Sequence, residues 1–297
     1  MRLAHRVDMS PLTRLPVSND HVRLGMMMEY YSQRACVPGT LLISEGTFIS
    51  ELDRGVPNVP GIYNEQQIEA GRQVTDAIHR KGSYIFCQLW VPGRGAIRGF
   101  AKAKGMSIYS SSAIPLHAGE VALRELTAEE IQGKIDNHIQ AAKNAMAAGF
   151  DGIELHGANG YLIDQFTQDA CNRRGDIYGG SIENRSRRAI GPQRAGIRLS
   201  QWSTYNGMRM RDPVPQFSDL IGRLSELGIA YLHLIGARAT GIEDAERPPG
   251  PFETLKFAYD LWKGPLLVGG GFTAESARQL VDVEFPDKNI VVMFGRS

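Results

Sequence analysis

The feature that most constrains the fold of this chain is a regular alternation of short apolar runs with longer helical patterns along its 297 residues. Short apolar runs bounded by turn residues are typical of buried strands, and strands that alternate with helices favour a parallel sheet. The apolar runs cover residues 6–9, 41–44, 84–90, 152–156, 195–200, 230–235, 265–269 and 290–294. The helical patterns cover residues 26–35, 64–81, 128–148, 181–190, 214–227, 252–262 and 274–281. Eight strand repeats predict closure into a (β/α)8 TIM barrel, an α/β fold that forms a single domain over residues 1–297.

The helix expected over residues 128–148 has the clearest boundaries. Thr127 and Glu130 have the spacing of a capping box, and Gly149 follows as a stop signal. One face of the pattern is apolar, and it consists of Ile131, Ile135, Ile139, Ala142 and Met146. We expect this face to pack on the barrel.

Composition excludes several classes of function. A formal net charge of +1 gives no electrostatic reason to expect nucleic acid as a partner. No apolar run is long enough to span a bilayer, so no membrane partner is expected. The first residues lack the apolar core of a signal peptide, which favours a cytoplasmic protein. Cys36, Cys87 and Cys171 have neither metal-ligand nor CxxC spacing, so we expect free thiols and no metal site.

The densest group of chemically capable residues follows the fourth predicted strand, in the sequence HGANGY that starts at His156. Such residues lie at the C-terminal edge of a parallel sheet, where barrel active sites are built. His156 and Asn159 can each donate a hydrogen bond to one carbonyl oxygen, and Tyr161 can supply a proton nearby. This trio suits the stabilisation of an enolate. The alternative is that His156 is a structural histidine and that Asn159 and Gly160 form an ordinary turn.

Glycines follow the last two predicted strands, at Gly269, Gly270 and Gly271 and again at Gly295, which precedes Arg296. Glycines expose backbone N–H groups, and barrels commonly bind phosphate in the loops after strands seven and eight. Because arginine suits bidentate phosphate contact, these loops predict a phosphate site. The alternative is that the three successive glycines are only a flexible turn.

Several motifs in a fixed order resemble those of the old yellow enzyme family of FMN-dependent ene reductases. The similarity runs from about residue 3 to the last residue, and it is nearest to the fungal branch, whose members act in secondary metabolism. The matching motifs are Pro11-Leu-Thr-Arg14, Ser44-Glu-Gly-Thr-Phe-Ile-Ser50, Gln88-Leu-Trp90, HGANGY, Gly196-Ile-Arg-Leu-Ser200, Gly269-Gly-Gly271 and Phe294-Gly-Arg296.

The resemblance implies FMN as cofactor and assigns residues to it. In the family pattern, the residues just after the first strand and Gly46 lie along the flavin ring, and Gln88 and Arg198 contact its pyrimidine portion. The glycines after the last two strands hold the phosphate together with Arg296. The cofactor-binding residues implied in this way are Pro11, Leu12, Thr13, Gly46, Gln88, Arg198, Gly270, Gly271, Gly295 and Arg296.

The resemblance also implies the reaction. NADPH, or NADH, would reduce the flavin, and a small α,β-unsaturated aldehyde or ketone would then accept the hydride. His156 and Asn159 would bind the substrate carbonyl oxygen, Tyr161 would be the proton donor, and Trp90 and Tyr205 would shape the substrate pocket. In the fungal branch, tyrosine at the position of Tyr161 goes with net reduction, and phenylalanine there goes with isomerisation.

Two departures from the family pattern concern the scaffold. The chain ends at Ser297, so we expect helix eight of the barrel to be missing. The helical pattern over residues 181–190 predicts a shortened helix four of roughly 15 Å. Apolar surface left uncovered by these changes would lower stability or be shielded in a homo-oligomer.

Two alternatives to an ene reductase stay open from the sequence. One is a redox-neutral isomerase or cyclase that uses the same His156, Asn159 and Tyr161. The other is a degenerate barrel that binds no flavin, because a fold does not fix a function.

Overall fold

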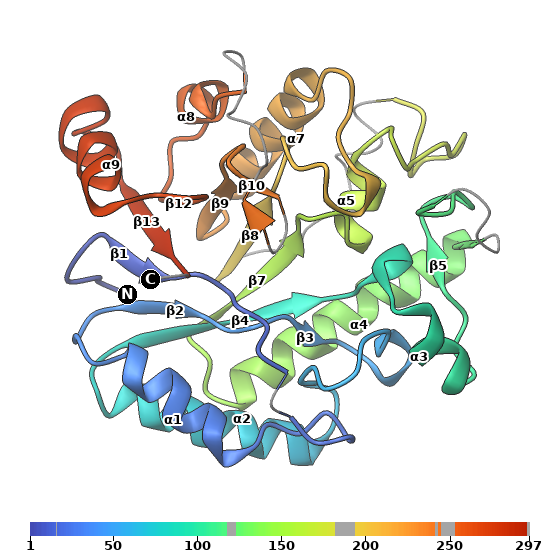
Figure 1. Cartoon of the computed structure of the whole chain (residues 1–297), viewed down its shortest axis with the longest axis horizontal. Helices are drawn as coiled ribbons and strands as arrows, with labels where there is room; N and C mark the ends of the chain where they lie inside the picture. Colours follow the sequence, from blue (N-terminus) through green and yellow to red (C-terminus); the bar gives the residue numbers. More distant parts are fainter. Residues whose placement is uncertain (16, 118–122, 182–193, 241–242, 245–252, 296–297) are drawn as a thin grey trace.

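Eight parallel strands close into a barrel in the computed structural model, which describes residues 1–15, 17–117, 123–181, 194–240, 243–244 and 253–295 (Figure 1). Each strand pairs with the next along the chain, and the first strand pairs with the last as well as with the second, which closes the ring. The barrel strands are β1 (Val7–Met9), β2 (Leu41–Ile43), β4 (Tyr84–Trp90), β7 (Gly152–Gly157), β8 (Ala195–Leu199), β9 (Tyr231–Ile235), β12 (Leu266–Gly269) and β13 (Ile290–Phe294). The predicted eight-stranded barrel is confirmed.

Helices surround the barrel on the outside (Figure 1). The longer ones are α1 (Gly25–Arg34), α2 (Glu65–His79), α4 (Ala128–Ala147) and α7 (Val214–Leu227), each within two residues of its predicted bounds. The shorter ones are α8 (Lys256–Leu261) and α9 (Ala274–Arg278), which runs on into the π-helical turn η4 (Gln279–Glu284).

The prediction of a helix over residues 252–262 was too long. Glu253 to Leu255 precede α8 without being helical. The carbonyl of Thr254 accepts a hydrogen bond from the Trp202 indole at 3.1 Å, so this backbone is held by a tertiary contact. The pattern over residues 181–190 lies almost wholly outside the described residues. The expected absence of helix eight concerns the end of the chain, where residues 296 and 297 also lie outside them.

The predicted capping box at the start of helix α4 is present, but the buried face of the helix differs from the predicted one. Glu130 N–H donates to Thr127 Oγ1 at 3.2 Å, and Thr127 N–H donates to Glu130 Oε2 at 2.9 Å. Ile139, predicted on the buried face, is 48% exposed, whereas Ala141 and Ala145 are fully buried. A small-residue contact therefore lets the helix approach the strands closely.

The interior of the barrel has an apolar part and a polar part. Side chains of alternate strand residues point inward, because successive side chains of a strand face opposite ways. The apolar part is formed by Leu41, Ile43, Phe86, Tyr231, Leu267, Val291 and Met293. Two residues after Phe86 and Tyr231 are the buried polar side chains of Gln88 and His233, and the buried Glu154 on β7 is the register partner of Gln88. The polar part thus lies nearer the C-terminal ends of the strands, where a site would be expected.

Further short elements lie in the loops between the barrel strands. They are β3 (Thr47–Phe48), η1 (Glu51–Asp53), η2 (Gly93–Gly95), α3 (Arg98–Ala103), β5 (Tyr109–Ser110), β6 (Arg124–Glu125), α5 (Leu162–Thr167), η3 (Tyr205–Gly207), β10 (Ala239–Thr240) and β11 (Glu243–Asp244). None of the described helices is both long enough and apolar enough to cross a bilayer. Cys36 is exposed, Cys87 and Cys171 are buried, and all three are free thiols.

Candidate active site

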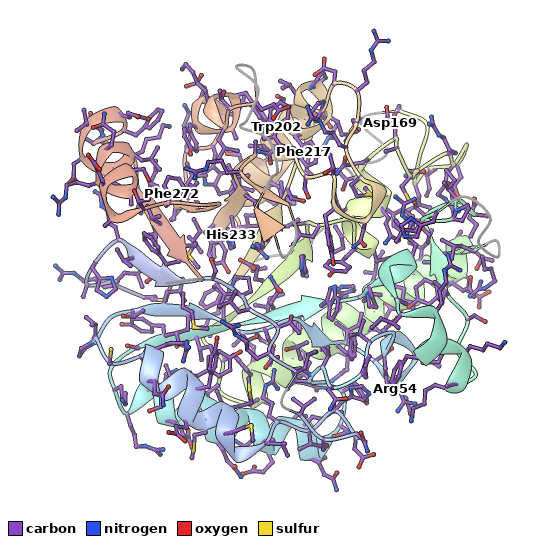
Figure 2. All side chains as sticks on the ribbon, viewed as in Figure 1. Arg54, Asp169, Trp202, Phe217, His233 and Phe272 are labelled. Carbon is purple, nitrogen blue, oxygen red and sulfur yellow. The ribbon has the colours of Figure 1, made fainter. Side chains whose placement is uncertain are left out.

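Strand register brings the predicted catalytic and flavin-contacting residues to one end of the barrel. His156 on β7 is the register partner of Arg198 on β8, which is in turn the partner of His233 on β9. Trp90 is the last residue of β4, the strand on the other side of β7. These side chains therefore lie together towards the C-terminal ends of four neighbouring strands, and Figure 2 labels His233 near the middle of the ring of strands.

Aromatic contacts fix the position of His156 and Tyr161. The Tyr161 ring packs edge-on against the His156 ring at 4.9 Å and against the Trp90 ring at 4.8 Å between centroids. Trp90 is itself stacked on Phe48 at 5.4 Å. Tyr161 is the residue immediately before helix α5, so its backbone is also fixed by the start of that helix. The Tyr161 ring is thus positioned by its contacts with His156 and with Trp90, which is stacked on Phe48.

Asn159 is placed by its backbone. Its φ angle of 59° is left-handed, a conformation that asparagine tolerates better than most residues. The Asn159 N–H donates to Ser200 Oγ at 2.7 Å, and its carbonyl accepts from Asn206 Nδ2 at 2.9 Å. Gly160 follows at φ 68°, and a side chain there would meet Asn206 at 2.6 Å. The loop after β7 is therefore docked tightly on the loop after β8.

Burial sets the protonation of the two titratable groups. It lowers the pKa of His156 well below the ordinary value, and the charge of Arg198 acts in the same direction. Burial also raises the pKa of Tyr161, and Tyr205 adds to that rise. At neutral pH the site therefore presents a neutral imidazole and a protonated phenol, both of which can donate a hydrogen bond.

Tyr205 and Arg94 extend the site along the loops. Tyr205 is half-buried in η3, next to Asn206. The buried Arg94 donates from its guanidinium to the carbonyls of Asn206 at 3.0 Å and Gly207 at 3.2 Å. Arg94 thus ties the loop after β4 to the loop after β8, a role that the sequence analysis missed because it joins residues far apart in the chain.

A buried carboxylate, which the sequence analysis also missed, lies below the trio. Glu154 accepts hydrogen bonds from Gln88 Nε2 at 2.7 Å, from His233 Nδ1 at 2.8 Å and from the Tyr231 hydroxyl at 3.1 Å. Gln88 therefore commits one of its two amide N–H groups to Glu154, and its other N–H group and its carbonyl oxygen are left for a ligand. Glu154 had been read as part of an apolar strand.

The residues predicted to lie along the flavin come from the loops after β1 and β2. Pro11 is buried, Leu12 is half-buried and Thr13 is exposed. Leu12 lies beside Gly295, where a Cβ atom would be 3.0 Å from its side chain. Gly46 is pressed against Trp90, and a Cβ atom there would meet the indole at 2.9 Å. These predicted cofactor residues thus follow three neighbouring strands of the barrel, β2, β1 and β13.

The glycine loop after β12 is packed against the loop after β9. Gly270 has φ 123°, and a Cβ atom there would lie 2.9 Å from the backbone nitrogen of Gly236. A Cβ atom at Gly271 would lie 3.3 Å from Nε of Arg238, an exposed residue. The structure therefore adds Arg238 as a cation at the predicted phosphate site. Arg296 lies outside the described residues.

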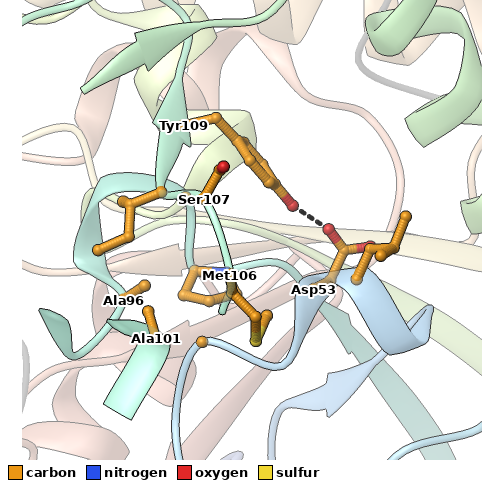
Figure 3. A pocket seen from close by; sticks show the side chains of 11 residues that line it. Asp53, Ala96, Ala101, Met106, Ser107 and Tyr109 are labelled. Carbon is orange, nitrogen blue, oxygen red and sulfur yellow. Dashed lines mark hydrogen bonds between the residues drawn. The ribbon is translucent and has the colours of Figure 1, made fainter. Parts of the chain in front are cut away.

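A small pocket elsewhere in the loops contains none of the predicted site residues (Figure 3). It is bordered by η1, η2 and the segment before β5, and the Tyr109 hydroxyl donates to Asp53 beside it. Asp53 also forms an ion pair with Lys134, whose Nζ lies 2.5 Å from Asp53 Oδ1. The pocket borders a structural junction and is not part of the candidate active site.

The residues at the barrel mouth fit a flavin. Of the twelve buried side-chain polar atoms that have no hydrogen-bond partner among the described residues, five gather there, namely Trp90 Nε1, His156 Nδ1, Asn159 Oδ1, Arg198 Nε and His233 Nε2. Unpaired buried polar groups cost free energy, so such a cluster indicates a polar ligand. The pyrimidine portion of a flavin offers both donors and acceptors to a guanidinium and a glutamine amide. The barrel mouth thus suits FMN chemically.

Comparison with known proteins agrees with this geometry. The model of the NADH:flavin oxidoreductase / NADH oxidase family matches residues 1–297. The NADP-dependent oxidoreductase lnbE of Aspergillus flavus is 48% identical, over 99% of this chain and 82% of its own length. The chanoclavine-I aldehyde reductase fgaOx3 of Penicillium roqueforti is also 48% identical, over 100% of this chain and 83% of its own length. The probable inactive reductase easA of Epichloe festucae var. lolii is 48% identical as well, over 99% and 81%.

The fold comparison gives the same result. The old yellow enzyme homologue of Zymomonas mobilis superposes with a TM-score of 0.86 at 34% identity, covering 100% of this chain and 87% of that structure. The sequence and structural matches both extend over the whole barrel. The chain therefore belongs to the NADH:flavin oxidoreductase / NADH oxidase family, and it is an FMN-dependent oxidoreductase of the old yellow enzyme type.

Proposed function

We propose that this protein uses NADPH to reduce the C=C bond of an α,β-unsaturated aldehyde or ketone. The observation that carries the proposal is the placement of His156, Asn159 and Tyr161 beside one another at the end of the barrel that also holds Arg198 and Gln88. Bound FMN supplies the hydride, which it receives from NADPH and delivers to the β-carbon of the substrate. The similarity to an aldehyde reductase supports an aldehyde as substrate.

In this proposal His156 and Asn159 bind the substrate carbonyl oxygen. The neutral imidazole has one N–H group to donate, and the Asn159 amide has two. Both residues are fixed before the substrate arrives, Asn159 through Ser200 and Asn206. Preorganised donors of this kind stabilise the charge that develops on the oxygen, and each contributes on the order of 3 to 4 kcal/mol in known oxyanion holes.

Tyr161 completes the reaction by giving its phenolic proton to the α-carbon. Its raised pKa keeps the proton on the hydroxyl until the carbanion character of the substrate develops. The product then carries one hydride at the β-carbon and one proton at the α-carbon, and the Tyr161 hydroxyl regains a proton from solvent. Trp90 and Tyr205 border the substrate in this scheme.

The cofactor would be held by residues on both sides of the barrel mouth. Pro11, Leu12, Thr13 and Gly46 are proposed to line the flavin ring, with Gln88 and Arg198 at its pyrimidine edge. The phosphate would be bound by Gly270, Gly271, Gly295 and Arg296. In this proposal residues 1–297 form a single FMN-binding domain. The protein acts in the cytoplasm as a homo-oligomer and takes part in secondary metabolism.

A redox-neutral isomerase or cyclase is the second candidate. A probable inactive reductase is as similar to this chain as the aldehyde reductase is, but the comparisons do not favour a redox-neutral reaction. Tyr161 argues for reduction, since an isomerase has no need of a net proton donor at the α-carbon.

The visible spectrum of the purified protein with added FMN tests the proposal. We expect stoichiometric binding of FMN and anaerobic loss of its visible absorbance on addition of NADPH, followed by recovery when an enal is added. A protein that binds FMN but is not reduced by NADPH would favour the redox-neutral candidate. A protein that does not bind FMN would refute the assignment of the cofactor residues.

A further inference from the structure

Glu154 is a fully buried charged group in the barrel interior. It lies on β7 two residues before His156, so both side chains point inward, and its exposed fraction is 0%. Its two oxygens accept hydrogen bonds from Gln88, His233 and Tyr231, which come from strands on both sides of β7. A carboxylate with this many donors is stabilised in its ionised form.

The absence of a side chain at Gly196 leaves room for one of these donors, Tyr231. Tyr231 lies on β9, and β8 stands between β9 and β7. The Tyr231 ring reaches across β8 at Gly196, where a Cβ atom would lie 2.2 Å from the ring. Glycine at this strand position is therefore required by the Tyr231 to Glu154 hydrogen bond, which indicates that the surroundings of Glu154 are built for it.

Glu154 also interacts electrostatically with Arg198. Burial raises the pKa of Glu154, but the neighbouring His233, Arg198 and Gln88 outweigh that effect and hold the pKa below its ordinary value. Burial lowers the pKa of His233, so this imidazole is neutral at pH 7 and donates from Nδ1. Arg198 is then the positive charge that balances Glu154.

We propose that Glu154 is a positioning residue that tunes the charge presented to FMN, by holding Gln88 in place and by partly offsetting the positive charge of Arg198. The inference rests on the proposed function, because it needs FMN at the barrel mouth. Positive charge near the flavin stabilises its reduced form, and the charge environment sets its reduction potential. The negative charge of Glu154 therefore holds the potential lower than Arg198 alone would set it.

The test is the reduction potential of bound FMN in two variants, measured by anaerobic titration against a reference dye. Glu154→Gln keeps the size of the side chain and removes its charge. We expect a more positive potential, with the preference for reduced over oxidised FMN rising about tenfold, which is about 30 mV for a two-electron couple. Tyr231→Phe removes one donor and keeps the Glu154 charge. We expect a smaller shift to a more negative potential, because the carboxylate is then less neutralised.

The opposite signs separate tuning of charge from a merely structural role. A structural role would weaken FMN binding in both variants, as seen by fluorescence titration, and move the potential in the same direction or leave it unchanged. Either of those results would overturn the inference. If Glu154→Gln does not fold, an unchanged or more positive potential in Tyr231→Phe alone contradicts it. Failure of the unaltered protein to bind FMN would instead refute the proposed function.

Discussion

At the level of single residues, Tyr161 is held protonated beside His156, and its ring is fixed by Trp90. Replacing Tyr161 with Phe keeps these ring contacts and removes only the hydroxyl. We expect the reduction of bound FMN by NADPH to be unchanged and its reoxidation by an enal to slow by about 10² to 10⁴-fold, the usual contribution of a positioned proton donor. Stopped-flow measurement of the two half-reactions checks this.

A matched control for that variant is Tyr259→Phe, a buried tyrosine on α8 that packs on Phe285. It should leave both half-reactions as they are. Equal slowing of both half-reactions in the Tyr161 variant would mean that the hydroxyl holds the site together and does not donate the proton.

Arg238 gives a second residue-scale prediction, because it lies beside Gly271 at the predicted phosphate loop. Arg238→Ala should weaken FMN binding about tenfold, or about 1.4 kcal/mol, through loss of one charge-assisted contact. Binding of riboflavin, which has no phosphate, should not change. Arg278→Ala, an exposed arginine on α9, is the control. An equal loss of riboflavin and FMN affinity would place Arg238 away from the phosphate.

At the level of elements, Asp53 joins the short helix η1 to β5 and to α4, and Figure 3 shows its hydrogen bond to Tyr109 of β5. It lies in η1 and is bonded to Ser50 at 2.6 Å, to Tyr109 of β5 and to Lys134 of α4 at 2.5 Å. Asp53→Ala leaves the largely buried Lys134 charge without its partner. We expect the free energy of unfolding to fall by about 3 to 5 kcal/mol, measured by urea denaturation.

The control for that variant lies in the same short helix. Glu51 is 67% exposed and pairs with Arg54 at 2.9 Å, so Glu51→Ala should cost less than about 1 kcal/mol. If the two variants were equally stable, the Asp53 junction would contribute nothing beyond a surface ion pair.

The elements were predictable from the sequence where periodicity decides them. The eight strands follow from apolar runs that stand between helical patterns, and α4 follows from the capping box at Thr127. The start of α8 was not predictable, because a contact from Trp202 holds Thr254. Glu154 was missed because a single charge in an apolar strand gives no sign of its partners on two other strands, β4 and β9. Arg238 was missed because its contact joins two loops.

At the level of the whole molecule, buried carboxyl groups make the stability depend on pH. Asp8 on β1 is buried, and burial raises its pKa to about 7, although the Leu41 N–H donates to it at 2.8 Å. The folded protein therefore binds a proton that the unfolded chain releases above its ordinary pKa of about 3.9. The contribution of Asp8 to the free energy of unfolding is therefore fully present below pH 4. It falls by up to about 1.4 kcal/mol per pH unit as the pH rises from 4 to 7, and it changes little above pH 7.

Asp8→Asn removes this dependence and keeps an oxygen for the Leu41 N–H. The loss of unfolding free energy between pH 5 and pH 7.5 should be smaller in the variant than in the unaltered apoprotein. Glu45 and Asp164 also have pKa values raised by burial to about 7, so part of the dependence should remain. Parallel pH profiles for the two proteins would show that Asp8 does not titrate on unfolding.

The identity of the reaction is tested most directly by the mass of the product formed from one enal, with NADPH deuterated at the transferred position and the reaction run in ordinary water. We expect consumption of one NADPH per product, with one deuterium at the β-carbon from the cofactor and one proton at the α-carbon by way of Tyr161. A product of unchanged mass, formed without consumption of NADPH, would contradict the account and identify a redox-neutral enzyme built on the same barrel.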